Sequence, residues 1–377
     1  TQLQSILQAN RNDPEALIAL NNAKIASAQS YAIATSLPIG TDPNGSLEIL
    51  RGVAQAQTEL NQSGGLGGFP LQVVIANDDN NPEIAKQIAN ALADDAKVLG
   101  VVGPYASDVS LAAASVYQSR QLVTISPIST ATKLSSFSPY FFRTVPSDYV
   151  AARSLANYML SNLKHQKAAI FFNSQSAYSQ SLKSEFQAAL SLGGGQTVAE
   201  FDLAGSGFSA AQSMETALRQ GAEVLMLAAN TGTVDAALQV VQVNRRRLAV
   251  LAGDDVYTLK TLEVGNEAAV GMVIAIPWHI AAPTSAEFAR RSRQLWGADV
   301  NWRTVTAYDA TRAIAAAAQQ NPNRVSIQQS LRNGMESPGA SRSVRFLPSG
   351  DRDAPVQLVR VSPSNRSARG YDFVPLN

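Results

Sequence analysis

Hydroxyl-bearing residues follow two successive apolar segments of the sequence, and both sets are suited to hold an anion. The first set lies after Val98–Val102, in the loop Gly-Pro-Tyr-Ala-Ser at residues 103–107. Ser107 stands where a helix is expected to begin, and exposed backbone amides at the positive end of a helix dipole attract negative charge. The alternative is that Ser107 simply caps this helix, which is the simpler interpretation of this residue taken alone.

The second set follows Leu122–Ser126 and includes Ile128, Ser129 and Thr130. Adjacent strands of a doubly wound sheet would bring Ser107 and Thr130 to the same edge of the sheet. There the hydroxyls and backbone amides could hold a carboxylate, with about 1.5–3 kcal/mol from each charge-assisted hydrogen bond. The alternative is ordinary turn chemistry, because Ser, Thr and Pro favour loops.

Two acidic residues, Asp254 and Asp255, follow the apolar segment Ala249–Ala252. A carboxylate at the carboxyl end of a strand would suit the ammonium group of a ligand. Pairs of aspartates also occur at 78–79 and 94–95, so the pair alone is a weak indication. Aromatic side chains in comparable loops, which can line a pocket or stack on a cation, are Tyr105, Tyr178, Tyr257 and Trp278.

Patterns typical of catalysis and of metal binding are absent from the sequence. The only histidines, His165 and His279, are far apart, there is no cysteine, and neither a Gly-x-Ser-x-Gly nor a Walker lysine motif occurs. No EF-hand spacing surrounds Asp254 and Asp255. An enzyme would have to work through carboxylates alone. We therefore predict no catalytic activity, no metal and no cofactor.

The composition of the 377-residue chain favours a globular protein with two α/β domains, since 45% of residues are hydrophobic and 16% are charged. The net charge is +1 and basic residues are scattered, which argues against a nucleic-acid partner or an anionic membrane surface. The lack of cysteine suits an exported protein. No apolar run approaches the ~20 residues of a membrane span, and no signal peptide is visible. We expect a leader or anchor to have been removed.

Strands and helices alternate from Tyr31 onward, which predicts mainly parallel, doubly wound sheets. The alternation restarts near residue 147, so we predict two Rossmann-like lobes joined by a multi-strand hinge, with ligands bound in the cleft between them. The predicted division is an N-terminal helical extension at 1–30, packed on the first lobe, a first lobe at 31–146 and 279–335, and a second lobe at 147–278 and 336–377. A final hairpin is predicted from residues 344–346 and 356–361, followed by a loose tail.

From Tyr31 along nearly the whole chain, the sequence resembles the type I periplasmic solute-binding proteins of the leucine/isoleucine/valine-binding kind. Eight features in the same order carry this resemblance, although none of them is specific by itself. They are Pro38-Ile39-Gly40, the helix and glycine turn at 52–68, Asp78-Asp79 with Pro82, Val102-Gly103-Pro104 with Ser107, Ile125-Ser126-Pro127 with Ser129-Thr130, Phe142-Arg143-Thr144, Tyr178 and Phe208-Ser209-Ala210.

The resemblance implies which residues bind a ligand. The α-carboxylate would be held by the first lobe, through Ser107 with the backbones of Tyr105 and Ala106, and through the loop Ile128, Ser129 and Thr130. The α-ammonium would meet an acidic residue of the second lobe, either Asp254 or, with a shift of one residue, Asp255. Further contacts from the second lobe would be Tyr178, Asn230 and Thr231.

The resemblance also implies a function. It indicates the extracytoplasmic substrate-binding component of an ABC transporter, which works as a monomer in the periplasm or on the outer face of the cytoplasmic membrane. This component would bind a free amino acid by closure of its lobes and then dock onto permease subunits. A ligand-sensing domain of a signalling receptor, a binder of amide, urea-like or carboxylate solutes, and a scaffold without ligand are alternatives. The N-terminal extension lies outside the family pattern and could be a spacer from a membrane anchor.

Overall fold

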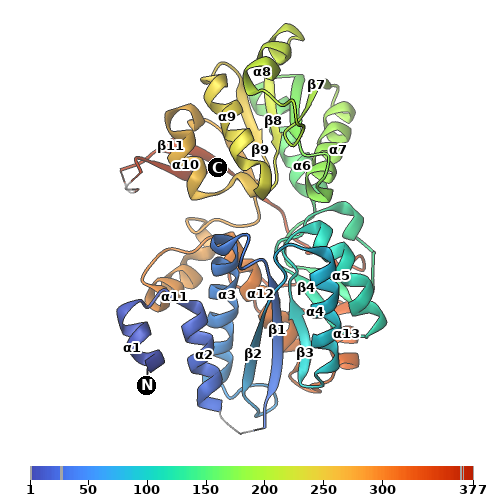
Figure 1. Ribbon diagram of the computed structural model, residues 1–377, viewed down its shortest axis with the longest axis vertical. Helices are drawn as coiled ribbons and strands as arrows, with labels where there is room; N and C mark the ends of the chain where they lie inside the picture. The colour runs from blue at the N-terminus through green and yellow to red at the C-terminus, as the bar shows by residue number, and fades with distance from the viewer. Residues whose placement is uncertain (1, 26–28, 366, 368, 377) are drawn as a thin grey trace. The chain divides into compact units, whose positions relative to one another are not determined.

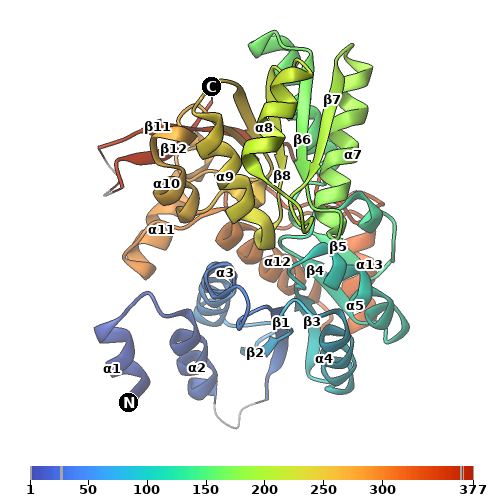
Figure 2. The same cartoon turned by 45° about the horizontal axis from the view of Figure 1, so that its top comes forward.

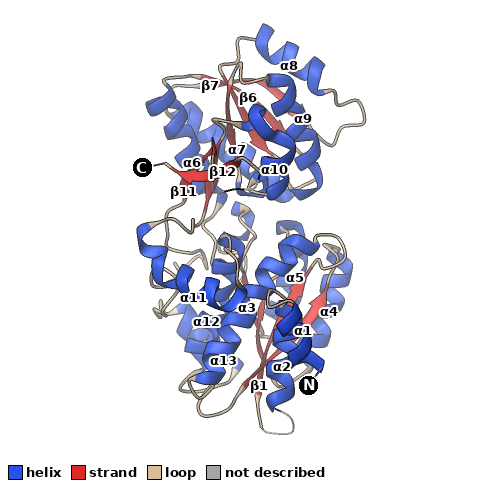
Figure 3. Ribbon diagram, turned by 90° about the vertical axis from the view of Figure 1, so that its left-hand side faces the viewer, coloured by secondary structure: helices blue, strands red, loops and turns tan. Residues whose placement is uncertain are grey.

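The computed structural model describes residues 2–25, 29–365, 367 and 369–376. The chain forms two compact units, unit 1 with residues 1–146 and 278–354 and unit 2 with residues 147–277 and 355–377, and it passes between them at three places. Each unit is a mainly parallel sheet flanked by helices, which confirms the predicted fold class (Figures 1 and 3). The ends of the predicted extension and tail at 1, 26–28, 366, 368 and 377 lie outside the described residues.

Unit 1 contains a five-stranded parallel sheet in the order β2-β1-β3-β4-β5. Helices α3, α12 and α13 cover one face of this sheet, and α4 and α5 cover the other (Figure 1). The strands are β1 (Tyr31–Leu37), β2 (Leu71–Asn77), β3 (Val98–Val102), β4 (Val123–Ser126) and β5 (Phe141–Arg143). The helices are α1 (Gln2–Ala9), α2 (Pro14–Ile25), α3 (Pro43–Gln62), α4 (Pro82–Asp94), α5 (Ser107–Ser119), η1 (Thr132–Leu134), η6 (Pro283–Ser285), α11 (Ala286–Trp296), α12 (Trp302–Ala318) and α13 (Arg324–Arg332).

Unit 2 contains a seven-stranded sheet in the order β12-β11-β10-β9-β8-β6-β7, in which β11 pairs antiparallel with both β10 and β12 and the other pairs are parallel. The strands are β6 (Lys167–Phe172), β7 (Gln196–Asp202), β8 (Val224–Ala228), β9 (Ala249–Ala252), β10 (Val273–Ile276), β11 (Gln357–Pro363) and β12 (Tyr371–Pro375). The helices are α6 (Asp148–Asn157), η2 (Tyr158–Leu163), α7 (Ala177–Leu192), α8 (Ala210–Arg219), η3 (Thr231–Thr233), α9 (Val234–Asn244), η4 (Asp254–Val256), α10 (Leu259–Gly265) and η5 (Asn266–Ala269).

The central strands are buried on both faces, which explains their uninterrupted apolar sequences. All five residues of β3 and of β8 are buried. In β8, Val224 and Met226 pack into a core with α6 and α7, while Leu225 and Leu227 point to the opposite, equally buried face. A strand that helices cover on both faces therefore needs no alternation of polar and apolar residues.

Residues 336–354 lie in unit 1, although the sequence led us to place them in the second lobe. The side chains of this segment are anchored there. Arg143 on β5 donates through Nε to Asp351 at 2.7 Å, and Arg352 pairs with Asp309 of α12 at 3.2 Å. The rings of Phe142 and Phe346 lie 5.1 Å apart. These contacts link residues far apart in sequence, so local patterning does not reveal them.

The predicted hairpin between residues 344–346 and 356–361 is wrong. Val344 and Phe346 form only isolated bridges, and both lie in unit 1. Strand β11 instead pairs antiparallel with β10 and with β12, which occupies the region predicted to be a loose tail. Apolar packing orders this strand, because Phe373 of β12 is buried and stacks on Tyr257 with ring centroids 4.1 Å apart.

The N-terminal extension is helical and packs in unit 1, as expected, with α2 beside α3 (Figure 2). The Asn22 carboxamide accepts from Val73 N at 3.1 Å and donates to Val73 O at 2.8 Å, so it pairs with the edge strand β2 like a short strand. Arg51 of α3 donates to Asn12 at 2.8 Å. Short elements that the sequence did not reveal are β5, β10, α10 and α11.

Among the described residues, no helix is long and apolar enough to cross a membrane. In the same part of the chain, no three His, Asp or Glu side chains are grouped so that they could hold a metal ion.

Helices α3 and α12 approach each other closely at Gly52. A Cβ atom at this position would lie 2.1 Å from the carbonyl oxygen of Thr304 and 2.7 Å from the amide nitrogen of Tyr308. Both neighbours are backbone atoms of α12, so neither can rotate away as a side chain would. Only glycine therefore allows this helix contact.

We predict that Gly52→Ala lowers the free energy of unfolding by about 1–3 kcal/mol, the usual cost of overpacking. Urea unfolding followed by circular dichroism would measure this, because the signal reports on the helices of both units. Gly207→Ala is the control, because a Cβ there meets no atom within 4 Å. Equal stability of the two variants would contradict the packing argument.

Candidate functional site

The loops that follow β3 and β4 in unit 1 are tied together by serine hydroxyls. Ser129 Oγ donates to the carbonyl oxygen of Tyr105 at 2.8 Å, and Ser126 Oγ donates to that of Pro104 at 2.8 Å. Ser110 Oγ lies 2.8 Å from Ser129 Oγ. Because β3 and β4 are neighbours in the parallel sheet, both loops lie at its carboxyl edge. The two predicted sets of hydroxyls therefore do meet.

Ser107 is the first residue of α5, whose N-cap is Ala106 with no side-chain hydrogen bond. The interpretation of Ser107 as the cap is therefore wrong by one residue. Its Oγ instead accepts the N–H of Ala131 at 3.3 Å, which leaves the hydroxyl proton to donate elsewhere. Thr130 is 4% exposed, and its Oγ1 has no hydrogen-bond partner among the described residues. A buried hydroxyl without a partner costs about 1–3 kcal/mol.

The other predicted residues of unit 1 mainly support the loops. The amides of Ile128 and Ser129 donate to Ser126 Oγ at 3.3 and 3.0 Å, and the Ala106 carbonyl accepts from Ser110 N at 2.9 Å. Among the predicted serine and threonine residues of unit 1, Ser107 and Thr130 are thus the two whose hydroxyl protons are not used within the loops.

Unit 2 brings Tyr178 and Asp254 together. Tyr178, in the first turn of α7, donates its phenol proton to Asp254 Oδ1 at 2.7 Å. Burial, and then the neighbouring Asp254 and Asp255 carboxylates, raise the pKa of Tyr178 well above its usual value. The phenol therefore stays protonated and orients the Asp254 carboxylate. A Cβ at Gly253 would lie 2.3 Å from Tyr178 Oη and 2.4 Å from Leu182 Cδ2, so this position has no space for a side chain.

Asp255 differs from Asp254 in its role. Asp255 Oδ2 accepts from the amide and the hydroxyl of Thr231, at 3.0 and 3.3 Å. Asn230 Oδ1 accepts from Asn173 Nδ2 at 3.0 Å. These bonds link the loops at the carboxyl ends of β6, β8 and β9, which are neighbouring strands. Asp255, Thr231 and Asn230 thus support the loops, whereas Asp254 is bonded to Tyr178.

Arg303, in the first turn of α12, was not predicted from the sequence. Its side chain is buried, its Nε donates to Tyr105 Oη at 3.2 Å, and its guanidinium carbon lies 4.4 Å from the centre of the Trp302 ring. A cation in the first turn of a helix opposes the helix dipole and is normally disfavoured. An arginine two residues after a helix-capping residue such as Asn301 was therefore the available signal in the sequence.

Comparisons of the sequence identify related proteins. A model of the periplasmic binding protein family matches residues 41–367. The Leu/Ile/Val-binding protein homolog 3 of Brucella melitensis is 23% identical over 321 residues, which are 82% of this chain and 84% of that protein. The amino acid binding protein of Pseudomonas aeruginosa is 30% identical over 141 residues. This second alignment spans only 37% of that relative's length.

Solved structures show the same fold. The ABC transporter substrate-binding protein from Desulfitobacterium hafniense in complex with Leu has a TM-score of 0.78 at 23% identity, covering 92% of this chain and 100% of that one. A solute-binding protein of an ABC transporter from R. palustris in complex with 4-hydroxybenzoate has a TM-score of 0.80 at 17% identity, covering 93% and 96%. Because the family model spans most of the sequence, the chain belongs to the periplasmic binding protein family.

Proposed function

We propose that this protein is the extracytoplasmic substrate-binding component of an ABC transporter, that it binds a free amino acid, and that it catalyses no reaction. The observation that carries this proposal is the buried Thr130 hydroxyl, which has no partner among the described residues. It lies in the loop tied to the start of α5, where helix amides and the Ser107 hydroxyl suit a carboxylate. Relatives described as amino acid binding and Leu/Ile/Val-binding proteins support the same ligand class.

Asp254 is the proposed partner of the ligand's ammonium group. A carboxylate can accept about four hydrogen bonds, so Asp254 can hold the Tyr178 proton and an ammonium at once. In this proposal the ligand first binds the hydroxyl loops of unit 1, and unit 2 then closes and supplies Asp254. Closure is favoured only to the extent that the ligand contacts both units. The closed protein would act as a monomer and dock onto permease subunits, with or without a membrane anchor.

A carboxylate solute without an ammonium group is the second candidate ligand. The relative from R. palustris that holds 4-hydroxybenzoate favours it. In that case Ser107 and Thr130 would keep their role and Asp254 would have no cation to meet. A ligand-sensing domain of a signalling receptor is the alternative to transport, and it would use the same groups but a different partner protein.

We predict that Thr130→Ala and Asp254→Asn each weaken the binding of the preferred amino acid about 10- to 100-fold, because each removes a charge-assisted hydrogen bond of about 1.5–3 kcal/mol. Thermal shifts with the twenty amino acids would identify the ligand, and calorimetry would give the affinities. Thr311→Ala and Asp202→Asn are matched controls, since both residues bond only within their own part of the fold.

The chemistry of the ligand separates the candidates. Blocking either the carboxylate or the amine of the amino acid should abolish the shift. If only carboxylates such as 4-hydroxybenzoate bind, and Asp254→Asn binds them normally, the second candidate ligand is correct. If no amino acid stabilises the protein, the amino-acid proposal fails while the family assignment stands.

We also predict that Gly253→Ala weakens ligand binding at least as much as Tyr178→Phe. The added methyl group would displace the Tyr178 phenol from Asp254, whereas Tyr178→Phe removes only the donor and keeps the ring. Gly232→Ala is the control, because its Cβ would lie an ordinary 3.7 Å from Asn230 Nδ2. A folded Gly253→Ala protein with wild-type affinity would show that the Tyr178–Asp254 bond is not needed for binding.

A further inference from the structure

A groove on unit 1 lies apart from the residues proposed to bind the amino acid. It has a volume of about 690 Å³, and a smaller hollow of about 320 Å³ adjoins it and shares Ser63 and Arg312 with it. Volumes of this size are typical of small-molecule sites. The groove is lined by α3, α11 and α12, through Gln55, Thr58, Glu59, Gln62, Ser63, Arg291, Gln294, Leu295 and Arg312.

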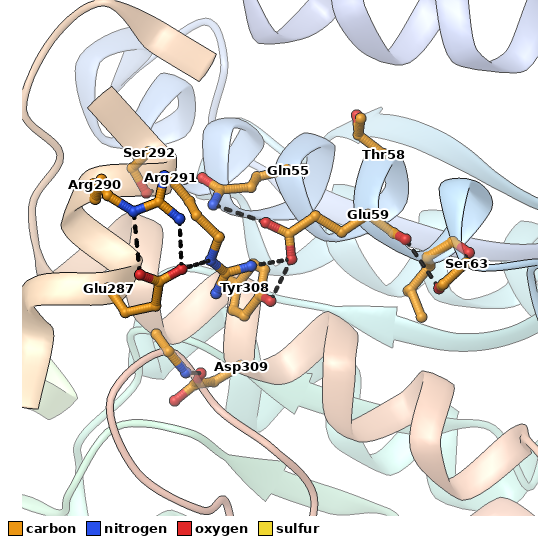
Figure 4. A network of polar contacts seen from close by, with 12 residues as sticks. Gln55, Thr58, Glu59, Ser63, Glu287, Arg290, Arg291, Ser292, Tyr308 and Asp309 are labelled. Atoms are coloured by element: carbon orange, nitrogen blue, oxygen red, sulfur yellow. Dashed lines mark hydrogen bonds and ion pairs between the residues drawn. The ribbon is translucent and has the colours of Figure 1, made fainter. Parts of the chain in front are cut away.

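One wall of the groove is a polar network centred on Glu59 (Figure 4). Tyr308 donates to Glu59 at 2.7 Å, Arg291 pairs with Glu59 at 2.6 Å, and Gln55 Nε2 donates to its other oxygen at 3.1 Å. Burial, together with the bond to Glu59, raises the pKa of Tyr308 to about 12. The bonds from Tyr308, Arg291 and Gln55 thus occupy both carboxylate oxygens of Glu59. Arg291 Nε is buried and forms an ion pair with Glu287 at 3.7 Å, which is too long for a hydrogen bond.

The Arg312 side chain is a cation that takes no part in this network. It is half-buried, it lines both hollows, and it has no ion pair or side-chain hydrogen bond to any described residue. The Arg312 side chain is not required to cap the carboxyl end of α3, because the carbonyls of Glu59 and Leu60 already accept hydrogen bonds from the amide and hydroxyl of Ser63. With two arginines and one glutamate in its lining, the groove carries a net charge of +1.

The N-terminal extension bonds to residues that line the groove. Asn21 of α2 donates to Thr58 Oγ1 at 2.8 Å. Arg11, in the loop before α2, donates to the carbonyl oxygens of Leu295, at 3.2 Å, and Gln294. Three lining residues are therefore held by a segment outside the sheet and helices of the doubly wound core. The groove is a built feature of unit 1 rather than a gap between loosely packed helices.

We propose that this groove binds a small molecule that carries an oxyanion group, either a carboxylate or a phosphate. The Arg312 guanidinium is the main contact, since its fork of donors matches two oxygens of such a group. The side-chain amide of Gln62, which lines the same groove, is a further donor. Arg312 lies nine residues beyond Arg303 on α12, about 13 Å along the helix at 1.5 Å per residue. The site is thus separate from the proposed amino-acid site and independent of the proposed function.

The test uses inorganic phosphate and succinate as probes, at constant ionic strength maintained with sodium chloride. We expect at least one probe to raise the melting temperature of the wild-type protein in a saturable way, and calorimetry to show at least tenfold weaker binding by Arg312→Gln. The comparison of the two probes distinguishes a phosphate from a carboxylate ligand. Arg293→Gln is the matched control, because Arg293 is exposed on α11, pairs with Asp299 and lies outside the groove lining.

A second measurement does not depend on any variant. Phenylglyoxal modifies accessible arginines, and mass spectrometry would follow the reaction at Arg312 and Arg293 in the wild-type protein. We expect the bound probe to slow modification of Arg312 and not of Arg293. The proposal is overturned if neither probe stabilises the protein, or if Arg312→Gln binds the probe as well as wild type does. Amino-acid binding should be unchanged in Arg312→Gln, so failure of one proposal does not imply failure of the other.

Discussion

Two serine hydroxyls, from Ser126 and Ser129, fix the geometry of the unit 1 half of the proposed site. They bond the loop after β4 to the carbonyls of Pro104 and Tyr105 in the loop after β3, and all of these residues are buried. A buried carbonyl without a donor is costly, so the loops are held in one relative position. Gly103 begins this arrangement with φ +129°, where a Cβ would lie only 2.4 Å from the carbonyl oxygen of Ser36. The donors at Ser107 and Thr130 are thus pre-organised, which lowers the ordering cost of binding.

The segment 336–354, which lies in unit 1, fixes the position of helix α12. Asp309 in the middle of this helix pairs with Arg352, and both side chains are almost completely buried. Burial raises the pKa of Asp309, although the charge of Arg352 opposes this. A buried pair of this kind adds little net stability, but breaking it is expensive. It therefore acts mainly to fix where α12 lies, and with it the contact of Arg303 with Tyr105.

Fold and site could be predicted from the sequence to different extents, for physical reasons. The uninterrupted apolar runs of β3 and β8 identified buried parallel strands, and the loops proposed to bind the ligand were then placed at the carboxyl ends of such strands. The role of each side chain in these loops could not be predicted from the sequence in the same way. Ser107 and Ser129 carry the same hydroxyl, and only the tertiary neighbours show that Ser129 is used to hold Tyr105 O. Asp254 and Asp255 are likewise adjacent in sequence, and the partners Tyr178 and Thr231 distinguish them.

The C-terminal end of the chain was the least predictable part, and both ends of the chain pack against edge strands. Strand β12 covers β11, and α2 covers the edge strand β2 through the Asn22 carboxamide. Edge positions leave unpaired backbone groups, which must be covered by whatever segment is near in space rather than in sequence. The extension also bonds to the end of α11 through Arg11. Removing residues 2–25 would therefore expose β2 and remove the bonds to Thr58, Gln294 and Leu295 in the groove lining. A spacer would not need these bonds, so the extension is a structural part of unit 1, whatever else it connects to.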